Sequence, residues 1–219
     1  LTLFNPEPAN VINGRPVLYD ATTTSSNGEA SCSSCHVFGD FHRLAWDLGN
    51  PDEREVTSPI TQHLSEATTD KDFFPMKGPM TTQSLRGLAR HGAMHWRGDR
   101  SVGPFGTDEF DEELSFNNFI VAFPGLLGND GQISVADMQK FTDFILDVEY
   151  PPNPIRPFSN VLTGNALSGQ NLYNGAVTDG LFNCNGCHQL DPLLGRFGTN
   201  RNATFEAETQ LFKIAHLRN

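Results

Sequence analysis

Cys32-Ser33-Ser34-Cys35-His36 is matched in pattern by Cys184-Asn185-Gly186-Cys187-His188 later in the chain. Each stretch is a Cys-x-x-Cys-His motif, the attachment sequence of a c-type haem. In such a site the two thiols hold the haem as thioethers, and the adjacent histidine supplies an axial nitrogen to the iron. The two motifs use all four cysteines of the chain. The sequence therefore predicts two covalently bound haems c, with His36 and His188 as the proximal iron ligands.

Paired cysteines also occur in zinc sites and in redox dithiols. Two Cys-x-x-Cys pairs can form one four-cysteine zinc site, and a single pair can act as a thioredoxin-type dithiol. Neither alternative requires a histidine after the second cysteine, whereas His36 and His188 follow both pairs. The spacing therefore favours haem attachment over zinc binding or a disulfide.

The composition is that of a globular protein with one large or two small domains. The chain has 219 residues, and the absence of a run of about 18 apolar residues predicts no membrane-spanning segment. Its net charge is −11 and its 15 basic residues are scattered, which argues against nucleic acid and favours a positively charged redox protein as partner. That partner is expected to be an electron donor or acceptor. Membership of a larger electron-transfer assembly and formation of an oligomer are both open alternatives.

Attachment of haem c normally takes place on the outer side of the cytoplasmic membrane. We therefore expect a periplasmic or extracellular protein. The chain shows no signal peptide at Leu1, so the expectation includes a leader that is not part of this sequence.

Two further elements are repeated around the motifs. A segment with a Leu-Tyr pair precedes each motif, in residues 13–20 and 168–175, and a Leu-Arg pair follows each, in residues 82–87 and 214–219. The shared order predicts two related halves, each with a short helix before the haem loop. The predicted organisation is a first cytochrome c-like domain at 1–150, a proline-rich linker at 151–160, and a second, incomplete cytochrome c-like domain at 161–219.

The predicted fold class is all-α, with long irregular loops. Ser134 is a suitable N-cap with Asp137 three residues later, and apolar residues recur at helical spacing from 135 to 148. A less regular helix is predicted at 114–123. Strand patterns are weak, and the many Gly and Pro residues indicate loops, among them an exposed one at 21–31.

The group opposite each proximal histidine decides between electron transfer and catalysis. A second strong ligand gives a six-coordinate iron suited to electron transfer, whereas an open face admits peroxide or oxygen. For the first haem we favour His95, with Met76 and Met80 as alternatives, although core packing stays open for both methionines and an interior hydrogen-bonded role for His95. The second ligand of the second haem has three candidates: His216, a histidine from the first half, or a residue beyond Asn219. We favour the last.

Other residues are candidates for contacts with the haem rather than with its iron. Arg86, Arg97 and Arg100 suit the haem propionates, because a guanidinium pairs bidentately with a carboxylate; ordinary salt bridges are the alternative. Trp96 could pack on a haem edge or in a protein core. The stretch 129–134 lacks the first carboxylates of a calcium loop, so a calcium ion between the domains is an open alternative that no residue pattern supports.

Three short stretches, together with the two motif-bearing halves, resemble the bacterial di-haem cytochrome c peroxidase and MauG-like family. They are Lys77-Gly78-Pro79 leading into Thr82–Arg86, then Trp96-Arg97-Gly98, and finally Phe212–Asn219, which is similar to the family's Lys-Thr-Pro-Thr-Leu-Arg-Asn run. The resemblance implies two cytochrome c-like domains around an interdomain cleft. It also implies that the first haem is the peroxidatic one and the second receives electrons.

The acidic catalytic residue of that family has no counterpart in the matching stretch. Residues 115–124 contain no carboxylate, and a peroxidase needs a group that moves a proton between the peroxide oxygens. The catalytic residue is therefore unassigned. We favour a di-haem electron-transfer cytochrome over a peroxidase or MauG-like oxidase with one open haem, and a gas-sensing haem module is a third alternative.

Overall fold

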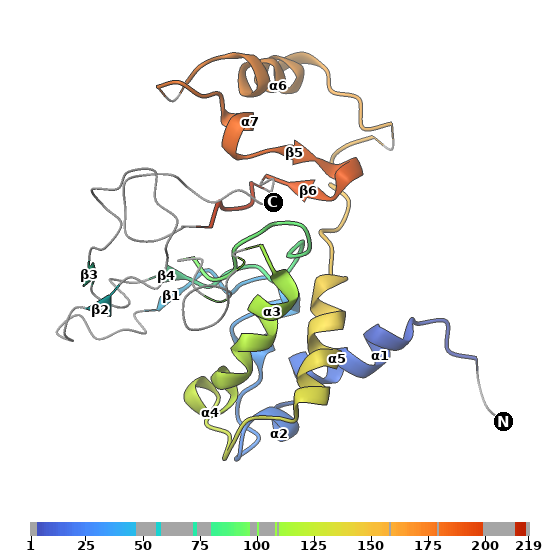
Figure 1. The fold of residues 1–219 in the computed structure, drawn as a ribbon. Coiled ribbons are helices and arrows are strands. Elements are labelled where there is room, and N and C mark those ends of the chain that lie inside the picture. Colours follow the sequence, from blue (N-terminus) through green and yellow to red (C-terminus); the bar gives the residue numbers. More distant parts are fainter. Residues whose placement is uncertain are drawn as a thin grey trace.

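The computed structural model describes residues 4–46, 56–57, 72–73, 80–96, 100, 108, 110–157, 159–178, 180–198 and 213–217. Helices dominate these residues, and the few strands are two residues long. The helical part of the predicted fold class is therefore confirmed (Figure 1).

The helices and strands follow one another along the chain with long connections between them. The α-helices are α1 (Ala9–Tyr19), α2 (Ala21–Thr24), α3 (Glu112–Asn117), α4 (Ala122–Leu126), α5 (Val135–Leu146), α6 (Gly164–Gly175) and α7 (Cys184–Cys187). The 3-10 helices are η1 (Cys32–Ser34), η2 (Val37–Gly39), η5 (Asn118–Val121) and η6 (Pro192–Leu194). The antiparallel strand pairs are β1 (Ala45–Trp46) with β4 (Met80–Thr81), β2 (Val56–Thr57) with β3 (Asp72–Phe73), and β5 (Leu190–Asp191) with β6 (Arg196–Phe197).

The core of the first half forms where α1 crosses α5 (Figure 1). Gly14 lies at the crossing, and a Cβ atom placed there would lie 2.2 Å from the Lys140 carbonyl oxygen and 2.3 Å from Phe144 Cβ. The missing side chain therefore lets the two helices approach closely. The buried apolar cluster around this contact contains Leu18, Leu85, Leu88, Met94, Phe116, Phe123, Met138, Phe141, Phe144 and Ile145.

The two helices predicted from the sequence are present. The Ser134 side chain accepts a hydrogen bond from Asp137 N at 3.1 Å, which caps α5 as expected. The helix predicted at 114–123 lies within the run of α3, η5 and α4. Val135, the first apolar residue of the predicted pattern, is 79% exposed, because it is the first residue of α5, ahead of the turns that pack on α1 and α3.

The expectation of an exposed loop at 21–31 is right only in part, because residues 21–24 are helical and Thr24, Ser25 and Ser31 are buried, whereas 26–29 are non-helical and exposed. The Asp20 side chain accepts from Thr22 N at 2.9 Å and starts α2. The Thr24 hydroxyl is fully buried and bridges the carbonyls of Asp20 and Ala30 at 3.0 and 3.2 Å. Small hydroxyl side chains that satisfy nearby backbone groups thus fold this spacer against the first half.

The second half is built around α6 and α7. The expected helix with a Leu-Tyr pair is α6, which has no buried residue; Leu172 is 63% exposed, whereas its counterpart Leu18 is buried. The Tyr173 hydroxyl donates to the His188 carbonyl oxygen. Residues 151–157 are irregular, and the domain boundaries stay a prediction. Within the described parts of the chain, no helix has the length and apolarity to cross a membrane.

Candidate haem attachment sites

Each Cys-x-x-Cys-His motif folds into a single helical turn. In the first motif His36 N donates to the Cys32 carbonyl oxygen at 2.9 Å, and in the second His188 N donates to that of Cys184 at 2.8 Å. The Asn183 side chain caps the second turn by accepting from Gly186 N at 2.8 Å. A helical turn brings residues three apart to the same side. The two thiols of each motif are thus neighbours, and the histidine follows directly.

Both motif histidines bond to a backbone carbonyl through the same ring nitrogen. His36 Nδ1 lies 2.8 Å from the Gln83 carbonyl oxygen, and His188 Nδ1 lies 3.0 Å from that of Ala215 and 3.1 Å from that of Gly198. A carbonyl only accepts, so the proton is on Nδ1 and the lone pair is on Nε2. This is the arrangement found in metal-bound histidines, where the outer hydrogen bond fixes the tautomer and the ring direction.

The carbonyl acceptors occupy equivalent places in the two Leu-Arg elements. Gln83 stands two residues before Leu85, and Ala215 stands two residues before Leu217. The two halves therefore repeat a hydrogen bond as well as a sequence pattern. The sequence predicted the Leu-Arg elements but not their role as hydrogen-bond acceptors for the motif histidines. Their fixed order after each motif was the signal that could have indicated this role.

The two cysteines of the first motif lie where burial disfavours the thiolate form. All four are free thiols. Burial raises the pKa of Cys32 to about 12 and also raises the pKa of Cys35, so neither is a ready thiolate of the kind that binds metals or attacks disulfides. Across the described residues, which include all four cysteines, no three His, Cys, Asp or Glu side chains gather as a metal site.

The residues proposed as second iron ligands lie in several places. Met80 is in β4, opposite Trp46 of β1. His95 has a positive φ of 63°, and its ring meets Phe119 edge-on at 6.2 Å. Met76 lies outside the described residues. His95, Met76 and Met80 stay predicted ligands of the first haem.

Arg86 and Trp96 have partners within the protein. Arg86 donates to the Phe38 carbonyl oxygen at 2.8 and 3.3 Å and lies 3.7 Å from the Asp40 carboxylate, which ties the loop after the first motif to the Leu-Arg element. Trp96 Nε1 donates to the Thr81 carbonyl oxygen at 2.6 Å. Arg97 lies outside the described residues. Arg100 has its guanidinium 5.0 Å from the centre of the Phe119 ring.

A buried polar cluster that sequence reasoning missed surrounds His216. Its Nδ1 lies 3.0 Å from the Tyr150 hydroxyl, and its ring centre lies 4.3 Å from that of His91. Lys213 Nζ donates to the Ala93 carbonyl oxygen at 3.1 Å. Burial lowers the pKa of His91 to about 4, that of Lys213 to about 8 and that of His216 to about 2. The segment 213–217 thus packs deeply against the first half.

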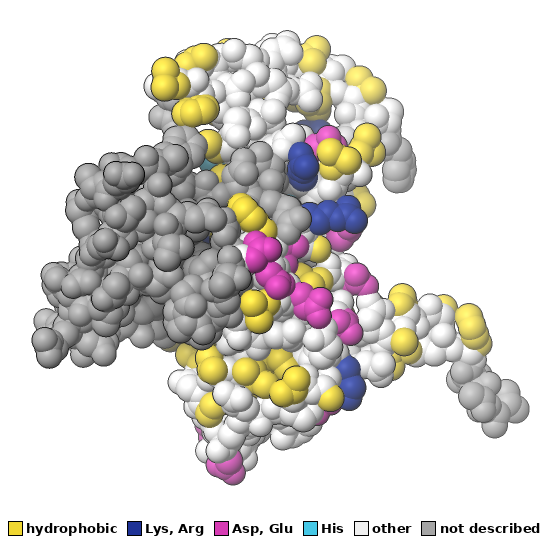
Figure 2. All heavy atoms as spheres, in the orientation of Figure 1, with side chains coloured by type: hydrophobic (Ala, Val, Ile, Leu, Met, Phe, Trp, Pro, Cys, Tyr) yellow, Lys and Arg dark blue, Asp and Glu magenta, His cyan; other side chains and the backbone are white. Residues whose placement is uncertain are grey.

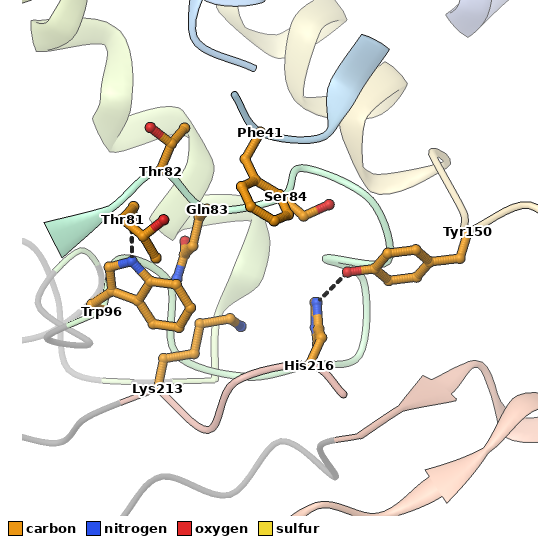
Figure 3. A pocket seen from close by; sticks show the side chains of 9 residues that line it. All are labelled: Phe41, Thr81, Thr82, Gln83, Ser84, Trp96, Tyr150, Lys213 and His216. Atoms are coloured by element: carbon orange, nitrogen blue, oxygen red, sulfur yellow. Dashed lines mark hydrogen bonds between the residues drawn. The ribbon is translucent and has the colours of Figure 1, made fainter. Parts of the chain in front are cut away.

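A cavity of about 140 Å³ lies beside this cluster (Figure 3). Residues 81–84 form one wall, Lys213 and His216 form the opposite one, and Phe41, Trp96 and Tyr150 complete the lining. The cavity therefore lies between the Leu-Arg element of the first half and that of the second. Through Gln83 and Ala215 its two walls hold the two motif histidines.

This chain shares its fold with a solved protein structure. No family model matches the chain, and no curated protein matches it. A solved structure described as Kuenenia stuttgartiensis hydrazine synthase pressurized with 20 bar xenon matches 93% of this chain with a TM-score of 0.57 and 20% identity. This chain spans 54% of the matched chain. At this identity the likeness shows a shared fold alone, and the resemblance to di-haem peroxidases and MauG-like proteins stays a prediction.

Proposed function

We propose that this chain is a di-haem c-type cytochrome that carries electrons between redox partners outside the cytoplasm. The observation that carries the proposal is the matched pair of hydrogen bonds from His36 Nδ1 and His188 Nδ1 to backbone carbonyls. Each leaves an Nε2 lone pair on a histidine that directly follows two free thiols in the sequence, and these are the groups that covalent haem attachment requires.

The haem, when bound, supplies the one-electron couple, and the protein holds its axial ligand. The carbonyl oxygens of Gln83 and Ala215 hold the imidazoles in one tautomer and one direction. They also make the Nε2 of His36 and His188 more basic, which favours the oxidised iron. Both acceptors are backbone atoms in segments packed against the first half. A rigid ligand frame suits electron transfer.

Mass spectrometry of the exported holoprotein tests haem attachment. The intact mass should exceed that of the polypeptide by two haems, and acid-acetone should not extract the colour. Replacing both cysteines of one motif, Cys184→Ala with Cys187→Ala, should remove one haem and leave the other. Ser33→Ala, inside the first motif but not a thiol, is the matched control and should keep both haems. A wild-type mass without two haem increments would refute the proposal.

An oxidase or peroxidase with one open haem is the second candidate function. The observation that favours it is the shared fold with a chain of an enzyme described as a hydrazine synthase. Optical and electron paramagnetic resonance spectra separate the two functions. Low-spin signals from both haems that do not change with peroxide or cyanide support electron transfer, and a high-spin signal that shifts on adding peroxide supports the enzyme.

The ligand prediction for the first haem has a test of its own. His95→Gly should convert a low-spin six-coordinate haem into a high-spin one if His95 binds the iron. Unchanged spectra and an unchanged midpoint potential would show that another residue, or none, is the ligand.

A further inference from the structure

The chain turns sharply directly after the first motif, in a conformation that phenylalanine rarely adopts. Phe38 has a φ of 55° and Gly39 a φ of 70°, both in the left-handed region. This conformation is strained for Phe38, because its Cβ atom comes too close to the following carbonyl oxygen. Burial of the ring does not offset the strain, since Phe38 is 75% exposed. Other contacts must therefore hold the turn in place.

Hydrogen bonds from the Leu-Arg element of the first half hold this turn. Arg86 Nε and Nη2 both donate to the Phe38 carbonyl oxygen, at 3.3 and 2.8 Å, and Leu85 N donates to that of Gly39 at 3.0 Å. The Arg86 side chain is only 22% exposed, and hydrogen bonds from a charged donor are stronger than those from a neutral one. Leu85 is buried in the core of the first half, so the element is a fixed support for the turn.

The same turn determines how His36 presents its ring. Gly39 N donates to the His36 carbonyl oxygen at 2.9 Å, and His36 has a φ of −95° and a ψ of 63°. His188 in the second motif has nearly the same backbone, with a φ of −94° and a ψ of 63°, although β5 follows it instead of a left-handed turn. A conformation that is reached by two different routes indicates that the direction of the histidine matters.

We propose that Arg86 is a positioning residue for the first iron ligand, and that it acts through the Phe38 carbonyl oxygen. By holding the left-handed turn closed, it keeps His36 Nδ1 against the Gln83 carbonyl oxygen, 2.8 Å away. This role rests on the proposed function, in which His36 binds iron. It differs from the pairing of Arg86 with a haem propionate, because all three guanidinium nitrogens have partners in the turn, the third lying 3.7 Å from the Asp40 carboxylate.

This role predicts a change in the redox potential of one haem. Arg86→Lys keeps the positive charge but loses the planar fork that reaches Phe38 and Asp40 at the same time. The turn should then loosen, and the hydrogen bond from His36 Nδ1 to the Gln83 carbonyl oxygen should weaken. A less basic Nε2 stabilises the oxidised iron less. The midpoint potential of the first haem should therefore rise, and that of the second haem should not change.

A redox titration of the holoprotein measures both potentials. Intact mass first verifies two haems in wild type and variants, so that a failure of haem attachment is separated from a failure of this proposal. Cys184→Ala with Cys187→Ala, which should remove the second haem, identifies the redox step of the first. Arg156→Lys is the matched control, because Arg156 is exposed and donates to Asn160 Oδ1 at 2.9 Å, and it should leave both potentials unchanged.

Amide hydrogen exchange measures the turn directly, without the iron as reporter. The Gly39 amide hydrogen bonds to the His36 carbonyl oxygen, and it exchanges only when the turn opens. It should exchange about tenfold faster in Arg86→Lys than in wild type, because the loss of a hydrogen bond from a charged group shifts an opening equilibrium by about that factor. Arg156→Lys should exchange at the wild-type rate.

Relief of the strain at Phe38 separates the positioning role from propionate binding. Asparagine is several-fold enriched at positive φ, so the turn should need less support in Phe38→Asn. Arg86→Lys should therefore shift the potential of the first haem much less in the Phe38→Asn background than in wild type. If Arg86 paired with a propionate, the shift would be the same in both backgrounds, and the propionate bending band of the resonance Raman spectrum would move with it.

Two results overturn the proposal. One is a first-haem potential that is the same in Arg86→Lys and wild type, which would leave Arg86 with a role in stability alone. The other is an equal shift with and without Phe38→Asn, which would assign Arg86 to a propionate. If Arg86→Lys does not accumulate, Arg86→Gln, which keeps N–H donors without the charge, replaces it in both backgrounds.

Discussion

Gly198 holds one of the two carbonyls that fix His188. Its φ of +102° is a backbone conformation that is strained for any residue with a side chain. A Cβ atom at this position would lie 2.4 Å from Leu217 N. Gly198→Ala should therefore displace the segment around Leu217, weaken the bond from His188 Nδ1 and lower the free energy of unfolding by about 1–3 kcal/mol.

The effect of Gly198→Ala should be local to the second motif. In a redox titration of the holoprotein, the midpoint potential of one haem should change and that of the other should not. Gly131→Ala, at a position with open space and no positive φ, should leave both potentials unchanged. Equal shifts at both haems in Gly198→Ala would contradict the assignment of this carbonyl to His188.

Burial of His91 makes stability depend on pH. Its side chain is 1% exposed, and desolvation with the nearby Lys213 charge lowers its pKa from 6.5 to about 4. Between these values the unfolded chain binds the proton and the folded chain does not. The free energy of unfolding should thus fall as the pH drops from about 6.5 to 4, by up to roughly 3 kcal/mol from this group.

His91→Gln, which cannot take up that proton, should flatten the pH profile. Urea unfolding of the holoprotein at several pH values between 4 and 7 measures the difference from wild type. A variant profile as steep as that of wild type would show that His91 does not titrate on unfolding in this range.

At the residue scale, the sequence predicted the haem motifs because that chemistry depends on adjacent positions. It did not predict the cluster of His91, Tyr150, Lys213 and His216, since these residues meet only after the segment 213–217 packs against the first half. The carbonyls that hold the motif histidines were foreseeable in part, because the Leu-Arg pairs that follow both motifs marked the segments that carry them.

At the element scale, the crossing of α1 and α5 depends on the absence of a side chain at Gly14. Gly14→Ala should place a methyl group against the Lys140 carbonyl and Phe144 Cβ. It should lower the free energy of unfolding by about 3 kcal/mol or more, because the Lys140 backbone of α5 cannot move aside easily. Gly169→Ala in α6, where nothing lies within 4 Å, should instead raise the free energy of unfolding by about 0.5–1 kcal/mol, because alanine favours a helix more than glycine does. Thermal unfolding of both variants checks this contrast, and a Gly14→Ala protein as stable as wild type would show that the helices do not approach so closely.

Local signals predicted some elements well and others poorly. α5 was recognisable because its N-cap and its apolar spacing agree. The spacer at 21–31 was predicted correctly at 26–29 but not at its start, because Thr and Ser are common in loops, whereas the hydroxyls of Thr24 and Ser25 bond to backbone carbonyls and accompany a helical turn. α6 was foreseen as a helix, but its spacing did not indicate that Leu172 would be exposed.

At the scale of the whole molecule, charge should govern the choice of redox partner. The chain has 26 acidic and 15 basic residues, and Figure 2 shows acidic side chains in a band across the middle of the face it draws, at the level of α3. A net charge of −11 attracts cations and repels anions over distances of about a Debye length, which is roughly 10 Å at 0.1 M salt. The rate constant for electron transfer to a cationic oxidant such as hexaammineruthenium(III) should therefore exceed the value expected from its driving force. The rate constant for the anion ferricyanide should lie below the value expected from its driving force.

Stopped-flow oxidation of the reduced holoprotein at increasing salt concentration measures this steering. The rate constant for the cation should fall with salt, that for the anion should rise, and the two should approach the values set by their driving forces as screening becomes complete. The opposite salt trends make each oxidant the control for the other, because a general effect of salt on the protein would move both rates in the same direction. Rates that do not depend on salt would mean that electrons leave through a part of the surface where the net charge is not felt, and a basic redox protein would then lose its advantage as the natural partner.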